Sequence, residues 1–230
     1  MATPSSDKLH LGCGLMTPPT WLNVDGSFNA RLAKYPLLHK AARLVAGKKD
    51  GPKFSKNIYG HDLRKPLPWA EGSFKAVYAS HLLEHMYRSD AEFVLRECFR
   101  VLRPGGVVRI VVPDLAPLIR GYMTGEFPKW LDAHGNMTER ADRLILGLLM
   151  RVPQPARTNA VKKVYDNMYD FHSHKWMYDA ASLTAMLRRA GFSDVTNPGV
   201  FESRIAEIRE VEQESRVVDG AGVVAEGVKE

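Results

Sequence analysis

Cysteine is scarce in this chain of 230 residues, which contains only Cys13 and Cys98. Two cysteines cannot make the disulfide framework on which small exported proteins depend. Long apolar runs are also missing, because no stretch approaches the roughly 20 residues that a membrane helix needs. Residues 1–7 are polar and lack the apolar core of a signal peptide. We therefore expect no membrane segment and a reducing, cytoplasmic location.

A concentrated basic patch is absent as well, although the net charge is +6 and the isoelectric point is near 9.3. The basic residues come in scattered pairs, such as Lys48-Lys49 and Arg188-Arg189, without interleaved aromatic residues. This pattern favours a solvated basic surface over a nucleic-acid interface. With 45% hydrophobic and 25% charged residues, the composition is typical of a globular domain.

Strand-like and helix-like segments alternate along most of the chain. Short apolar runs predict strands over residues 8–11, 21–24, 58–59, 75–79, 107–112 and 192–196. Apolar residues at helical spacing predict helices over residues 29–46, 81–87, 91–102 and 179–190. Such alternation indicates βαβ units and a mainly parallel sheet. The interval between the first two strands contains Pro18 and Pro19 and is too short for a full crossover helix.

Two parts of the chain depart from this alternation. Between residues 115 and 170, glycine and proline repeatedly interrupt the helical pattern, which predicts an insertion of helices and loops. Residues 216–228, with Asp219-Gly220 as a turn, predict a last antiparallel strand. We expect one domain over residues 1–230, with 115–178 as a helical lid on the substrate side. Its fold class would be α/β, with a Rossmann-like sheet, mostly parallel with a C-terminal antiparallel strand, and helices on both faces.

Small and acidic residues follow the first two predicted strands. In an open α/β sheet, ligands bind at the carboxyl ends of the strands, where the strand order reverses. Gly12 and Gly14 allow positive φ and a close approach of the backbone to a ligand. Asp25 ends the second strand, where a carboxylate can accept hydrogen bonds from the two hydroxyls of a ribose. A plain turn and a helix N-cap are the simpler interpretations of these residues.

An ordered series of motifs runs along most of the chain. It consists of L-H-L-G-C-G at residues 9–14 with N-V-D at 23–25, H-D-L-R-K-P-L-P-W at 61–69, S-F-K-A-V-Y-A-S-H-L-L-E-H at 73–85, V-L-R-P-G-G at 101–106 and A-G-F at 190–192. Each motif alone is weak, but their order and spacing resemble the class I S-adenosylmethionine-dependent methyltransferases, in particular the type-11-like family. The resemblance implies S-adenosyl-L-methionine as the cofactor.

The resemblance also implies which residues contact the cofactor: Leu11, Gly12, Cys13, Gly14, Asp25, Asp62, Leu63, Ser80 and His81. Asp62 would meet the adenine amino group, and Ser80 with His81 would line the floor beneath the sulfonium. Cys13 is better interpreted as a packing residue than as a nucleophile, because no base is predicted beside it. The stretch after Gly14 is shorter than the family pattern. It leaves open how the methionine carboxylate is held, since a helix N-terminus would normally help.

Methyl transfer to a hydroxyl also needs a proton acceptor. The catalytic candidates are His85, Glu84 and His174, and the candidates for substrate contact are Asp114, Tyr122, His172 and Trp176. Histidine suits this role because its pKa lies near working pH. Helix packing explains the Glu84-His85 pair equally well, and a place in the core is the simpler interpretation of any one aromatic. A divalent metal bound by the histidines with Asp114 and Glu84 is not favoured, because no tight ligand spacing is present.

We therefore expect a methyltransferase acting on a small-molecule or carbohydrate (glycosidic) acceptor by O-methylation, in natural-product or polysaccharide modification, with a homodimer as an open option. The alternatives are a catalytically silent methyltransferase-like binding module and a nucleic-acid methyltransferase. The latter is disfavoured because S-H-L-L-E-H stands where an N-P-P-Y base-flipping motif would follow the fourth strand. A nicotinamide-dependent oxidoreductase would need a third glycine where Thr17 stands and an acid about 20 residues further on.

Overall fold

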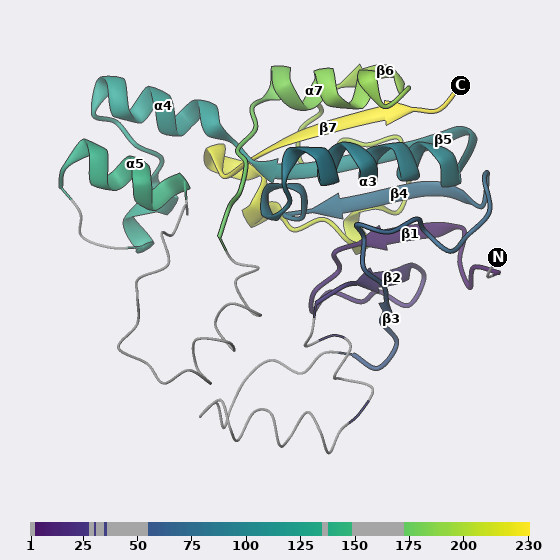
Figure 1. Cartoon of the computed structure of the whole chain (residues 1–230). Coiled ribbons are helices and arrows are strands. Elements are labelled where there is room, and N and C mark those ends of the chain that lie inside the picture. Colours follow the sequence, from purple (N-terminus) through teal and green to yellow (C-terminus); the bar gives the residue numbers. More distant parts are fainter. Residues whose placement is uncertain (1–2, 28–29, 31–34, 36–54, 135–137, 149–172) are drawn as a thin grey trace.

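The structure is a computed structural model that describes residues 3–27, 30, 35, 55–134, 138–148 and 173–230. Seven strands form one sheet in the order β3-β2-β1-β4-β5-β7-β6 (Figure 1). The strands are β1 (Lys8–Leu11), β2 (Leu22–Asp25), β3 (Tyr59–Gly60), β4 (Phe74–Ser80), β5 (Leu102–Pro113), β6 (Ser193–Thr196) and β7 (Gly222–Val228). All neighbouring pairs are parallel except those of β7, which runs antiparallel to β5 and β6. The predicted fold class is confirmed.

The strand order reverses between β1 and β4, in the middle of the sheet. β2 and β3 follow outward from β1, whereas β5 follows outward from β4. The register places Leu11 of β1 beside Ala79 of β4, so the chain leaves both strands at the same edge. This reversal is where an open α/β sheet binds its ligand. The residues after Leu11 and Ser80 therefore face the expected site.

Helices α3 and α7 cover one face of the sheet (Figure 1). The helices with described bounds are α3 (Arg88–Val101), α4 (Leu115–Thr124), α5 (Arg140–Leu148) and α7 (Ala180–Arg189), with 3-10 turns η1 (Leu83–His85), η2 (Lys129–His134), η3 (Ile208–Glu210), η4 (Glu214–Arg216) and η5 (Val218–Gly220). Asp179 caps α7 through a capping box with Ser182. None of the described helices is both long and apolar enough to cross a membrane.

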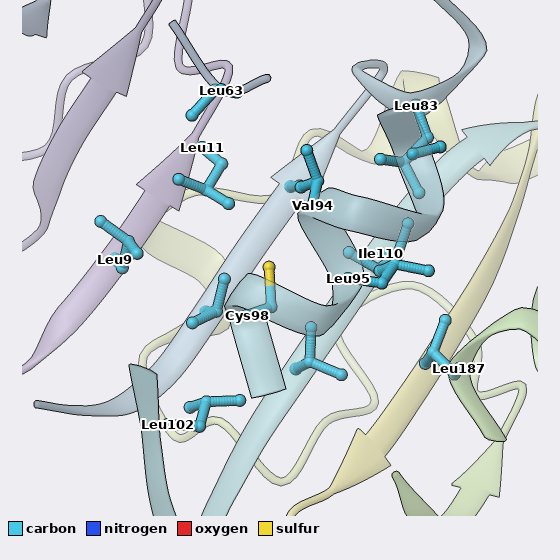
Figure 2. Close-up of a cluster of buried hydrophobic side chains, with 14 of the residues drawn as sticks. Leu9, Leu11, Leu63, Leu83, Val94, Leu95, Cys98, Leu102, Ile110 and Leu187 are labelled. Carbon is cyan, nitrogen blue, oxygen red and sulfur yellow. The ribbon is translucent and has the colours of Figure 1, made fainter. Parts of the chain in front are cut away.

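The larger hydrophobic core lies between the sheet and these two helices. Buried residues recur on α3 at positions 91, 94, 95, 98 and 101, which is one face of an α-helix. In Figure 2, Val94, Leu95 and Cys98 lie over the sheet close to Leu11 and Ile110. This packing fixes β1, β4 and β5 against one helix layer and so sets the edge at which the site lies.

The opposite face is covered in a different way. Residues 12–21, between β1 and β2, are described as turns and loop without a helix, as the prolines predicted. A second cluster on this face joins Trp21 and Tyr78 to Ile205, Ile208 and Val211. The last three residues belong to residues 197–221, which link β6 to β7 and carry η3, η4 and η5. This stretch, here called the 197–221 segment, covers the face.

Some predicted elements differ from the observed ones. Of the helix predicted over residues 81–87, only the turn η1 is present. His81, two residues before this turn, has a left-handed φ of 53°. The strand predicted to begin at residue 216 begins at Gly222, after η4 and η5. The helix predicted over residues 29–46 lies outside the described residues.

The predicted insertion contains α4 and α5. These two helices pack closely, because a Cβ at Gly147 would lie 2.5 Å from Leu118. Arg140 donates to the carbonyl oxygens of Tyr122 and Met123 near the end of α4. Figure 1 shows both helices beyond the carboxyl end of β5. Residues 149–172 of the predicted insertion lie outside the described residues.

Candidate functional site

The loop after β1 has the shape of a cradle. Gly12 and Gly14 have φ of 64° and 54°, a region that side chains disfavour. A Cβ at Gly12 would lie 3.0 Å from the Leu82 side chain, so this loop closely approaches the chain after β4. A Cβ at Gly14 would meet nothing within 4 Å, so its open side faces free space. The Cβ side of Gly14 therefore leaves room for a ligand against this loop.

Asp25 connects this loop to the end of β2. Its carboxylate is buried and accepts hydrogen bonds from the backbone N–H groups of Gly14, at 2.9 Å, and Ser27, at 2.7 Å. Two carboxylate oxygens have about four lone-pair positions, so these bonds leave room for a pair of hydroxyls. Asp25 thus shapes the loop and keeps capacity for a ligand at the same edge.

Asp62 follows β3 and lies near the end of β2. A Cβ at Gly26 would lie 2.6 Å from the His61 carbonyl oxygen, so the two loops touch. The Asp62 carboxylate accepts two 2.9 Å hydrogen bonds from the Arg64 guanidinium. Leu63 is buried in the main core. A ligand contact from Asp62 would therefore have to share its carboxylate with Arg64.

The end of β4 contributes Ser80 and His81. Ser80 is buried, and the His81 N–H donates to the Val111 carbonyl oxygen at 2.9 Å. The left-handed backbone of His81 is rare for a residue with a side chain, and such strain concentrates at functional sites. Burial, and then the neighbouring Arg216 guanidinium, lower the pKa of His81 to about 4. His81 is therefore a neutral imidazole at working pH.

Glu84 lies at the centre of a histidine cluster. Its side chain is fully buried, with Oε1 3.5 Å from His81 Nδ1 and 3.7 Å from His85 Nε2. Among the described residues, neither of its carboxylate oxygens has a hydrogen-bond partner. Burial raises the pKa of Glu84 to about 8, against the smaller opposing effects of its own backbone N–H, which is near but not hydrogen-bonded to the carboxylate, and of Arg216. Buried polar groups are normally paired, so this carboxyl needs an explanation.

His174 joins the cluster from the stretch before α7. Its ring centroid lies 5.2 Å from that of His85, and the ligand atoms of Glu84, His85 and His174 lie within 4.8 Å of one another. The backbone N–H of Lys175 donates to the Glu84 carbonyl oxygen at 2.7 Å, which fixes this stretch to η1. Burial, and then His85, lower the pKa of His174 to about 4. The structure thus brings the three predicted catalytic candidates together.

Such a cluster offers two kinds of chemistry. Neutral imidazoles around a carboxyl of raised pKa can exchange a proton near neutral pH. The three side chains also make a mixed N/O set of the kind that binds divalent metals. Asp114 does not join them, and its Oδ1 instead caps α4 by accepting from Ala116. In the part of the chain that the structure describes, no fourth Asp, Glu, His or Cys completes a metal site around these three residues.

The predicted substrate residues are spread more widely. Burial raises the pKa of Asp114 at the start of α4, where the backbone of Leu115 pairs with that of Tyr178. Tyr122 is half exposed near the end of α4, beside the Arg140 that caps this helix. Trp176 is exposed and packs against the Arg88 guanidinium, 5.3 Å from its ring centroid. The fourth candidate, His172, lies outside the described residues.

Arg216 is a residue at this edge that the sequence pattern did not single out. Its Nη1 donates to the Ser80 carbonyl oxygen and to Ser80 Oγ, both at 3.4 Å. It comes from η4 of the 197–221 segment, far from every motif in the sequence. The sequence does not predict this position of Arg216, because residues 216–228 are predicted as a single strand.

Comparison with known proteins gives one family match. Residues 9–110 match the model of a methyltransferase domain, a region that includes β1 to β5 up to Ile110 and the cluster residues Glu84 and His85. No curated protein matches the chain. The match therefore covers the candidate cofactor loop and two residues of the Glu84 cluster.

Solved structures of methyltransferases are similar over nearly the whole chain. One is the methyltransferase SibL, with 14% identity over 96% of this chain and 50% of that one, and a TM-score of 0.46. Another is a SAM-dependent methyltransferase from Thermotoga maritima, with 14% identity over 97% of this chain and 81% of that one, and a TM-score of 0.47. The chain thus spans half the length of the first and four fifths of the second.

Proposed function

We propose that this chain, whose residues 9–110 match the model of a methyltransferase domain, is an S-adenosylmethionine-dependent enzyme that methylates a hydroxyl of a small-molecule or carbohydrate acceptor. The observation that carries the proposal is the buried Glu84 cluster beside the glycine loop. Transfer to a hydroxyl, unlike mere binding, requires a group that accepts a proton. A carboxyl with a pKa near 8 is such a group.

The edge of the sheet fits S-adenosyl-L-methionine. The open side of Gly14 leaves room for a ligand against the loop, and the spare capacity of the Asp25 carboxylate suits the ribose hydroxyls. Leu11, Gly12 and Cys13 would contribute backbone, Asp62 and Leu63 would border the adenine, and Ser80 and His81 would lie beneath the methionine part. When bound, the cofactor supplies a methyl group that is already activated. The protein then has to align the acceptor and exclude water.

His85 has a defined tautomer in this geometry. Its Nδ1 lies 3.3 Å from the Ser173 carbonyl oxygen, which can only accept, so Nδ1 carries the proton. Nε2 is then left with its lone pair, 3.7 Å from Glu84 Oε1. We propose that the Glu84 carboxylate and the unprotonated Nε2 of His85 together take up the single proton released by the acceptor hydroxyl and then share it. His174 would hold the His85 ring from its other side.

The helices after β5 would bind the acceptor. Asp114 and the Trp176 side chain lie on stretches that flank the Glu84 cluster, and Tyr122 lies further along α4. We propose that the insertion over residues 115–178 lies on the substrate side, where Tyr122 and Trp176 would contact the acceptor. A flat aromatic such as Trp176 suits a sugar face or an aromatic ring.

The proposal is tested by following labelled methyl from S-adenosyl-L-methionine onto a panel of phenols and glycosides. We expect Glu84→Gln to lower kcat about 100-fold, the usual range for a lost general base, while Kd for S-adenosylhomocysteine changes less than threefold. Glu71→Gln is the matched control, because Glu71 is exposed. Tight binding of S-adenosylhomocysteine by wild-type protein without transfer to any acceptor would favour a binding module instead.

The pH dependence gives a second readout of the same cluster. The carboxylate form of Glu84 is populated only as pH rises through its pKa of about 8. The kcat of wild-type protein should therefore increase from about pH 6 through pH 8 and level off above about pH 9. In Glu84→Gln this rise should disappear, because glutamine does not titrate. A flat profile in wild-type protein would remove Glu84 as the proton acceptor.

A further inference from the structure

Arg216 lies at the carboxyl end of β4, beside the loop between β1 and β2 that contains no helix. We propose that its guanidinium binds the carboxylate of the methionine part of the cofactor. The inference rests on the proposed use of S-adenosyl-L-methionine and adds the residue that holds its charged end. No helix separates β1 from β2, so the helix N-terminus that would otherwise face an anion at this position is missing. A cation from another part of the chain can replace it.

The guanidinium lies at the reversal of strand order. Its Nη1 reaches the Ser80 carbonyl oxygen at the carboxyl end of β4. It is also close enough to His10 of β1 and to His81 to lower the pKa of both rings, although burial is the larger cause in each. Arg216 therefore lies between β1 and β4, at the edge where the Gly12–Gly14 loop opens.

The charge of Arg216 has no counter-ion in the described part of the chain. No carboxylate there lies within ion-pair distance, and Ser80 supplies the acceptors of its hydrogen bonds, both through Nη1. Arg109, on the same face, is paired with two glutamates. A half-buried guanidinium with Nε and Nη2 still available can bind a carboxylate in bidentate fashion.

The backbone holds Arg216 at this position. A Cβ at Gly222 would lie 2.1 Å from the Arg216 carbonyl oxygen and 3.0 Å from that of Val112, so only glycine permits this approach to the end of β5. Earlier in the segment, Glu210 accepts hydrogen bonds from Thr20 and from Trp21 Nε1. The loop after β1 and the segment that carries Arg216 are therefore joined directly, and the cation is placed in advance of any ligand.

The test compares two ligands that differ in the methionine carboxylate. S-adenosylhomocysteine carries the amino acid, whereas 5′-methylthioadenosine keeps the nucleoside and sulfur without it. By isothermal titration, we expect Arg216→Gln to weaken binding of S-adenosylhomocysteine about 10- to 100-fold, as for a lost charge-assisted pair. Binding of 5′-methylthioadenosine should change less than twofold. Arg216→Lys should recover part of the loss, because charge remains but the bidentate geometry does not.

Arg209→Gln is the matched control, since Arg209 is exposed on the same segment and stacks on Phe201. Equal weakening of both ligands by Arg216→Gln would overturn the inference and make Arg216 a packing residue. Unchanged binding of both ligands by Arg216→Gln would also overturn the inference. If the variant instead raised only the KM of an acidic acceptor, Arg216 would bind that substrate and not the cofactor. Failure of methyl transfer with the ligand difference intact would refute the proposed function but not this inference.

Discussion

Two buried charged clusters lie on this sheet, and they are built in opposite ways. Arg109 of β5 is fully buried and faces two buried glutamates, Glu212 and Glu226. Glu84 is equally buried, but within the described residues its carboxylate has ion contacts only with His81 and His85, at distances that exceed those of good hydrogen bonds. The first cluster is complete without any ligand, and the second is not.

The Arg109 cluster shows what a structural ion network looks like. Its guanidinium donates to both oxygens of Glu212, at 2.8 and 2.7 Å, and to the carbonyl oxygens of Glu202 and Gly199. Glu226 also accepts from Arg109, at 3.3 Å. Every partner except Glu226 belongs to the 197–221 segment, so the network fixes that segment to the sheet. A fully satisfied network rigidifies its surroundings.

The Glu84 cluster, in contrast, leaves its buried carboxyl without hydrogen bonds in the described residues. The loss of hydration at the Glu84 carboxyl is not repaid by hydrogen bonds in the described residues, and its pKa rises as a result. Such an arrangement lowers stability and is found where a group must exchange a proton. Burial alone therefore does not distinguish a structural charged cluster from a functional one. The two clusters differ in whether their buried polar atoms have hydrogen-bond partners.

The largest effect should come from removing the cation of the satisfied cluster. Arg109→Met would leave the Glu212 and Glu226 carboxylates buried without their counter-ion. Breaking a buried pair in this way costs about 3–5 kcal/mol, so we expect the free energy of unfolding to fall by that amount. Urea denaturation at pH 7 measures it. Arg209→Met, at an exposed site of the same segment, should stay within about 0.5 kcal/mol of wild type; a similar loss there would end the distinction.

The next effect has the opposite sign. Folding raises the pKa of Glu84 from 4.5 to about 8, so the folded state binds the proton more tightly. Wild-type stability is then lost as pH rises from about 4.5 to about 8. Glu84→Gln does not titrate, and it should be more stable than wild type by about 2–4 kcal/mol at pH 8.5.

At pH 4.5 that gain should shrink to about 0.4 kcal/mol, because Glu84 is protonated in the folded state and half protonated in the unfolded state of wild-type protein. Denaturation of both proteins at pH 4.5 and pH 8.5 checks the difference, in which the other titrating groups cancel. Glu71→Gln, at an exposed side chain, should show no such pH dependence. A gain that is the same at both pH values would mean that the Glu84 carboxylate is satisfied in the fold.

Much of the sheet could be predicted from the sequence because its signals are local. The buried residues 107–112 predict a central strand, and the Asp179 cap with Gly191 delimits α7. The glycine loop and Asp25 could be placed because they directly follow strands. Glu84, His85 and His174 were named as candidates from position and residue type, although nothing in the sequence set their distances.

The 197–221 segment could not be predicted, for a physical reason. Its 3-10 turns are only three residues long and give no sustained helical pattern, and its course depends on Arg109 meeting Glu212, 103 residues further along the chain. A pairing over that distance leaves no local pattern. Arg216 was missed for the same reason, because its place at the edge of β4 follows from the path of this segment. The turn η1 was predicted as a longer helix because apolar spacing alone cannot detect the left-handed backbone at His81.

The smallest expected effect tests whether each hydrogen bond of the Arg109 cluster contributes to the free energy of unfolding. Ser203 Oγ donates to Glu226 Oε2 at 2.5 Å, and the Arg204 N–H donates to the other oxygen. Ser203→Ala removes one donor and leaves the carboxylate otherwise paired, so we expect a loss of about 1–2 kcal/mol in the free energy of unfolding. Ser215→Ala is the control, because Ser215 is exposed on the same segment. Equal stability of Ser203→Ala and wild type would show that the cluster has spare donors, and the contrast with Glu84 would then rest on the ion pairs alone.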